Sequence, residues 1–102
     1  MGKVKEAVMV AEQAEVELEH TLTNRGKHYG KYQFVSTTAQ TLKDTLRKGA
    51  GWREMEPYMR ESLDMICNKL ARIVNGNPYY DDSWHDVAGY AMLVEAELNK
   101  GE

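Results

Sequence analysis

Apolar residues recur along this chain at steps of three and four positions, which is the spacing of one face of an α-helix. In the first segment the apolar stripe consists of Val4, Ala7, Val8, Ala11, Ala14, Leu18 and Leu22. Glutamates occupy the opposite face, and Gly26 follows shortly after the last apolar position, as is typical just past a helix end. The pattern predicts an amphipathic helix over residues 3–23.

Three further helices are predicted downstream, over residues 32–48, 53–74 and 83–99. Gly49 closes the second helix, Pro57 fits only the first turn of the third, and Asp82 or Ser83 caps the fourth. The positions expected to face the core of the last two helices are Leu63, Ile66, Leu70, Ile73, Val87, Ala91, Val94 and Leu98. Short turns between the helices favour an all-α fold, an antiparallel four-helix bundle forming one domain over residues 1–102.

The overall charge of the chain restricts the classes of molecule that it is expected to bind. Thirteen Lys+Arg against 16 Asp+Glu give a net charge of −3 and a pI near 5.6. A mildly acidic protein lacks the broad positive surface that coats nucleic acid or an anionic membrane, so neither is expected as a partner. The single cysteine, Cys67, falls in an apolar run and is interpreted as a buried thiol in a reducing cytoplasm.

Charge is unevenly distributed, since no acidic residue occurs from position 21 to position 42. Within this stretch Arg25, Lys27, His28 and Lys31 fall close together, with Tyr29 among them. Glycines on both sides let backbone N–H groups approach an anion, while the cations supply charge and the tyrosine a stacking face. The cluster fits a phosphate-bearing ligand, or equally a solvated loop whose cations pair with the glutamates of the first helix.

The third predicted helix carries a polar stripe, in which Glu61, Asp64, Asn68 and Arg72 follow one another at helical spacing beside Lys69. Carboxylates at this spacing can hold Mg²⁺ through their oxygens. Ordinary pairing of charges on a hydrated helix surface is the alternative interpretation, and it is the favoured one for Glu61 alone.

Residues 77–90 are dense in turn residues, aspartates and aromatics. Asp86 and Tyr90 share a helix face, and Trp84 can either anchor the core or stack on a base. Gly89 lies inside the predicted helix, where glycine costs on the order of 1 kcal/mol relative to alanine. Close packing of a neighbouring helix is the favoured reason for this glycine, ahead of the approach of a ligand.

Three motifs together resemble an uncharacterised small domain family of tailed bacteriophages and prophages. They are Arg25-x3-Tyr29-Gly30, Lys69-x2-Arg72, and a closing DxWxDxAGYA helix that runs from Asp82 to Ala91. The resemblance covers about three quarters of the chain, from Arg25 to Leu98, and it implies a phage protein acting in the cytoplasm of an infected cell.

A weaker similarity links the chain to the all-α nucleoside triphosphate pyrophosphohydrolases, which hold Mg²⁺ with two pairs of acidic residues on neighbouring helices. Glu12-x2-Glu15 and Glu61-x2-Asp64 have the matching spacing, although the two pairs stand farther apart than is usual in that family. This similarity implies a magnesium site in which Glu61, Asp64 and Asp86 take part.

We expect foremost a homo-oligomeric protein that binds a small nucleotide-like ligand and sequesters a nucleotide signal of host immunity. No catalytic residue, metal or cofactor is expected in that case. The ligand-binding residues are expected to be Arg25, Lys27, Tyr29, Lys69, Arg72, Trp84, Asp86 and Tyr90. The alternatives are the magnesium-dependent pyrophosphohydrolase and an inhibitor that binds a host protein. Replacing Arg25 or Lys69 by alanine is expected to weaken binding and to leave the melting temperature almost unchanged.

Overall fold

The computed structural model describes residues 28–101 of the 102-residue chain. Its elements are helix α2 (Tyr32–Arg47), the short 3₁₀ helix η1 (Trp52–Glu54), helix α3 (Pro57–Asn75) and helix α4 (Asp81–Asn99). No strand occurs between residues 28 and 101, so the all-α prediction is confirmed for this part of the chain. The helix predicted over residues 3–23 lies outside it. None of the described helices is long and apolar enough to cross a membrane.

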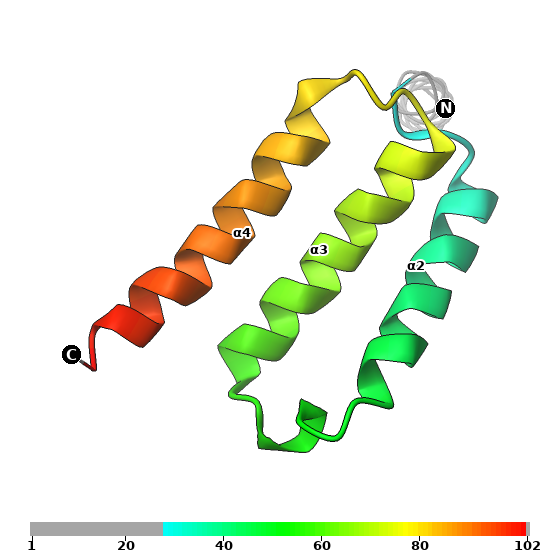
Figure 1. Ribbon diagram of the computed structural model, residues 1–102. Helices are drawn as coiled ribbons and strands as arrows, with labels where there is room; N and C mark the ends of the chain where they lie inside the picture. The colour runs from blue at the N-terminus through cyan, green and yellow to red at the C-terminus, as the bar shows by residue number, and fades with distance from the viewer. Residues whose placement is uncertain (1–27, 102) are drawn as a thin grey trace, which may run out of the picture.

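The three α-helices lie side by side, and each runs antiparallel to the one before it (Figure 1). Helix α3 is in the middle and contacts both α2 and α4, whereas α2 and α4 have little contact with each other. Residues 28–101 therefore form a single layer of helices, and α3 has a neighbour on each side.

The third predicted helix is divided in two by its proline. Pro57 is the first residue of α3, and Glu56 before it is extended, with ψ near 152°, because a following proline disfavours the helical conformation. The preceding residues instead form η1, which Arg60 secures from the first turn of α3. Its guanidinium donates hydrogen bonds to the backbone carbonyls of Trp52 at 3.1 Å and Arg53 at 2.7 Å.

Helix α2 is continuous although it contains many hydroxyl residues that are weak helix formers. Four hydroxyls donate hydrogen bonds to backbone carbonyls three or four residues earlier, which satisfies them inside the helix. These residues are Ser36, Thr37, Thr41 and Thr45. The helix ends at Arg47, one residue before the predicted end.

Helix α4 begins at Asp81, two residues earlier than predicted, and its N-cap residue Tyr80 makes no capping hydrogen bond with its side chain. The prediction that Asp82 or Ser83 caps the helix is therefore wrong. Asp82 is inside the first turn, and its carboxylate accepts a hydrogen bond from Tyr29 instead.

The hydrophobic core of the described layer is small. Val35 and Ala39 of α2 meet Ala71 of α3, which has no exposed surface. Within α4, by contrast, two positions that the sequence assigned to the core, Ala91 and Leu98, are exposed, because α4 packs only against α3 among the described helices. The layer thus leaves apolar surface uncovered on α4.

Candidate functional site

The segment that precedes α2 crosses the C-terminal end of α3 at very close range. Gly30 has a φ of 86°, and a Cβ atom added there would overlap the carbonyl of Asn75. A Cβ at Gly76 would likewise overlap the backbone of His28 and Tyr29. The backbone N–H of Asn77 donates to the carbonyl of His28 at 2.9 Å. The two glycines therefore allow the contact that fixes Tyr29 against α3 and α4.

Tyr29 links the two helices. Its hydroxyl donates a hydrogen bond to Oδ2 of Asp82 on α4 at 3.0 Å. The guanidinium of Arg72 on α3 lies over its ring, 4.8 Å from the centroid, in a cation–π arrangement. Partial burial raises the pKa of Tyr29, and the hydrogen bond to the Asp82 carboxylate raises it further, because ionised tyrosine could not donate that bond.

Lys69 and Asp86 form the second link between α3 and α4. Their Nζ and Oδ2 atoms are 2.9 Å apart, and the lysine is buried while the aspartate is half-buried. The hydrogen bond from Lys69 lowers the pKa of Asp86, so the carboxylate is ionised over a wider pH range. The lysine charge is accordingly already partnered by a carboxylate in this conformation.

Two aromatic rings extend the site toward the turn between α3 and α4. The rings of His28 and Tyr80 are stacked, with their centroids 4.1 Å apart and 22° between their planes. The Nδ1 atom of His28 is buried and has no hydrogen-bond partner among the described residues. This stack holds the segment leading into α2 against the residue that precedes α4.

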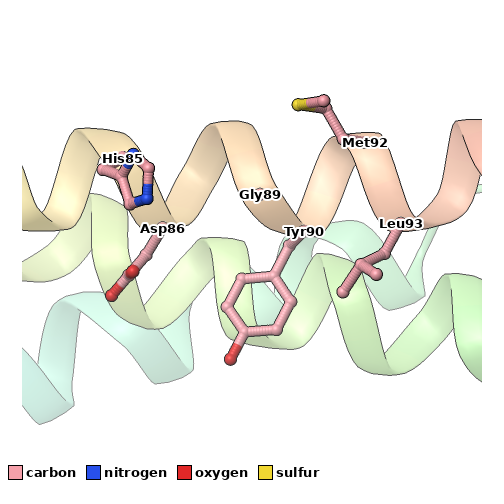
Figure 2. Close-up of a pocket in the computed structure, with 6 residues that line it drawn as sticks. All are labelled: His85, Asp86, Gly89, Tyr90, Met92 and Leu93. Atoms are coloured by element: carbon pink, nitrogen blue, oxygen red, sulfur yellow. The ribbon is translucent and has the colours of Figure 1, made fainter.

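An open hollow of about 640 Å³ lies along α4, directly beside the Lys69–Asp86 pair. Figure 2 shows Asp86, Tyr90 and Leu93 projecting to one side of the helix and Met92 to the other, with Gly89 between them. A Cβ at Gly89 would meet no atom within 4 Å. Close packing of a neighbouring helix, the favoured interpretation of this glycine, is therefore not present among residues 28–101.

The predicted ligand-binding residues divide into three groups. Tyr29, Lys69, Arg72 and Asp86 come together between α3 and α4, and Tyr90 follows Asp86 along the hollow. Arg25 and Lys27 lie outside the described residues.

Trp84 stands apart from this group. Its indole N–H donates to the carbonyl of Pro78 at 2.8 Å. The residue lies two positions from Asp86 and therefore on another face of α4.

The acidic residues suggested for Mg²⁺ are not assembled. Asp64 faces α2, where it pairs with Arg47 at 3.4 Å, whereas Asp86 faces α3 and pairs with Lys69. No group of three potential metal ligands occurs in the described part of the chain. The arrangement of residues 28–101 thus gives no support to a metal ion shared by Asp64, Asp86 and Glu61, which stays a prediction.

Sequence reasoning did not include Asp82, His28 or Tyr80 among the site residues. Asp82 precedes Asp86 by four positions on the same helix, a spacing that indicates a shared face. That spacing could have placed Asp82 in the site, but aspartate is also a common N-cap residue, and the sequence favoured that role. No spacing relates His28 to Tyr80, because their contact depends on the crossing of two distant segments.

The site must be interpreted from its own geometry. The chain matches no protein-family model, no curated protein and no solved structure.

Proposed function

We propose that this chain is a phage accessory protein that binds a small nucleotide-like ligand between α3 and α4 and sequesters it without turnover. In this proposal the protein is a homo-oligomer acting in the infected cell, and residues 3–23 supply the fourth helix of an antiparallel bundle. The phage setting rests on the resemblance of the three sequence motifs, and the ligand class rests on the chemistry of the site.

The observation that carries the proposal is that the guanidinium of Arg72 is held in place but has no acidic partner among the described residues. It is stacked on Tyr29, and no carboxylate of residues 28–101 lies within salt-bridge distance of it. A guanidinium can donate two parallel hydrogen bonds to a phosphate group, which makes it the preferred side chain for recognising that anion. The stack restricts the arginine side chain, so less conformational entropy is lost when it binds.

The neighbouring groups suit the remainder of a nucleotide. Lys69 lies on the same helix as Arg72, and its ammonium can turn from Asp86 to a phosphate, which leaves the carboxylate free to accept from a ribose hydroxyl. Tyr90 projects to the same side of α4 as Asp86 (Figure 2) and offers an aromatic surface for a base there. The local balance of two cations and two carboxylates favours a compact anion over a polyanion.

The test is a thermal-shift screen of nucleoside mono-, di- and triphosphates and cyclic dinucleotides, with and without Mg²⁺, followed by calorimetric titration of any compound that stabilises the protein. Binding to the folded state alone raises the melting temperature by mass action. We expect Arg72→Ala to weaken binding at least tenfold and Arg72→Lys to restore only part of it. Arg53→Ala is the matched control, because Arg53 is an exposed arginine outside the site.

The other outcomes of the screen separate the alternative functions. Release of pyrophosphate from a triphosphate would contradict sequestration and support the magnesium-dependent hydrolase. A complete lack of stabilisation would contradict nucleotide binding and favour an inhibitor that binds a host protein. Equal weakening by Arg72→Ala and Arg53→Ala would place the ligand elsewhere.

A further inference from the structure

Helix α4 has the composition of a buried helix but is covered on only one side. Its central residues 87–94 contain no charged side chain. Among all 19 residues of the helix only Ser83 is buried. Met92, Leu93 and Leu98 are 68%, 64% and 53% exposed. A helix that is apolar around most of its circumference requires partners on more than one face, and the described layer supplies only α3.

The uncovered face of α4 has a glycine next to larger apolar side chains, an arrangement that can receive another helix. Gly89 lines the hollow, and Figure 2 shows Met92 and Leu93 projecting to opposite sides of the helix one turn farther along. The space above the glycine is free of other described atoms to at least 4 Å. A glycine between larger apolar side chains lets a second backbone approach closely, which accounts for a residue that otherwise weakens the helix.

We propose that the apolar stripe of residues 4–22 of the same chain docks as a helix on this face of α4, an inference that rests on the fourth helix of the proposed function but not on its ligand. The stripe has a matching length, because residues 4–22 and α4 both comprise 19 residues, about 28 Å of α-helix. The segment also arrives in the right place. His28 is stacked on Tyr80, the residue immediately before α4, so only residues 23–27 separate the end of the stripe from the beginning of α4.

This connection sets the direction and register of the docked helix. Leu22 lies beside the first turn of α4, and Val4 lies beside its last turn, in an antiparallel arrangement. Ala14 and Ala11 are then level with Gly89 and Met92, so small side chains oppose the hollow where the two backbones approach. Val8 and Leu18 pack on either side of these alanines along the same stripe.

The first test is Gly89→Leu in the full chain. If the face were open, leucine would raise the melting temperature, because it is a better helix former and meets nothing among the described residues. Under a docked helix the leucine clashes, and we expect the melting temperature to fall by at least 4 °C. Gly51→Leu is the matched control, because a Cβ there also meets nothing within 4 Å, and it should change the melting temperature by less than about 2 °C. An increase or no change for Gly89→Leu would overturn the proposal.

A disulfide test identifies the occupant. In a Cys67→Ala background, Ala11→Cys combined with Met92→Cys should form an intramolecular disulfide, seen as a monomer of altered mobility on non-reducing electrophoresis. Ala11→Cys combined with Phe34→Cys is the control, since Phe34 is an exposed apolar residue on α2, and it should not cross-link. A disulfide-linked dimer from the first pair would show that a second copy covers α4, and no cross-link would show that the stripe docks elsewhere. Either result would overturn the proposal.

Discussion

The two sides of α3 differ in the side chains that are buried between the helices. Toward α2, Ala71 meets Val35 and Ala39 in a small apolar cluster. Toward α4, a buried lysine is paired with an aspartate at 2.9 Å, and Tyr29 contacts both Arg72 of α3 and Asp82 of α4. Lys69 and Ala71 are two positions apart, so helical geometry turns them to different faces. One helix can thus serve a structural interface and a chemical site at once.

The ion pairs on the two sides differ as well. Arg47 and Asp64, between α2 and α3, are 3.4 Å apart, and the arginine side chain is 44% exposed. The Lys69 side chain is only 11% exposed in its pair with Asp86. Because water screens the first pair but has little access to Lys69 in the second, we expect the first pair to contribute little and the second to be sensitive to loss of Asp86, which would leave a buried lysine without its partner. The difference between the two sides can therefore be measured by substitution.

The largest effect is expected on the apolar side, from Ala71→Leu. Ala71 has no exposed surface, so three extra carbon atoms must displace Val35, Ala39 or the helix backbone. We expect the free energy of unfolding to decrease by about 1–3 kcal/mol, measured by urea denaturation. Val74→Leu on the same helix is the control, since Val74 is 70% exposed, and it should change stability by less than about 0.5 kcal/mol. Equal effects of the two substitutions would contradict the packing described for α2 and α3.

An intermediate effect is expected on the polar side, from Lys69→Ala. The substitution removes a buried aliphatic stem together with the partner of Asp86, and we expect the melting temperature to fall by about 4–8 °C. The burial of Lys69 thus leads us to expect a larger loss of stability than the almost unchanged melting temperature expected from the sequence. Asp64→Asn in the exposed pair is the control and should lower the melting temperature by less than about 2 °C. A smaller effect for Lys69→Ala than for Asp64→Asn would reverse the comparison.

The fold of the described layer could largely be predicted from sequence, because helix periodicity and turn residues are local signals. Two features of the layer could not be predicted from these local signals, and each has a physical reason. Pro57 separated η1 from α3 because the residue before a proline avoids the helical conformation, and that effect was interpreted only as a restriction to the first turn. Ala91 and Leu98 fit the apolar period of a core, but periodicity reports that a face is apolar and not which element covers it.

The candidate site was only partly predictable. The pairs Lys69–Arg72 and Asp86–Tyr90 share helix faces and could be grouped from spacing. That Lys69 meets Asp86, and Arg72 meets Tyr29, depends on how α4 and residues 28–30 lie against α3, which spacing within one helix cannot show. Trp84 shows a similar limit, since its residue type suggested stacking on a base, whereas the hydrogen bond from its indole N–H to Pro78 depends on how the turn before α4 folds.

The smallest effect is expected from pH, and it acts on the polar side alone. The hydrogen bond from Lys69 lowers the pKa of Asp86 below the ordinary value of 3.8 that it has in the unfolded chain. The unfolded state therefore binds a proton first as the pH falls, so the stabilisation is complete above pH 3.8 and is lost as the pH falls through the lower pKa of the folded protein. We expect the free energies of unfolding of the native protein and Asp86→Asn to differ at pH 6 and the difference to shrink as the pH falls below 3.8, as measured by urea denaturation at each pH. Lys69→Met removes the donor of this bond, and in that background Asp86→Asn should give a smaller difference at pH 6 and less change with pH. A native-to-variant difference that stays constant between pH 6 and pH 3 would show that the two sides of α3 do not differ in the way their contacts indicate.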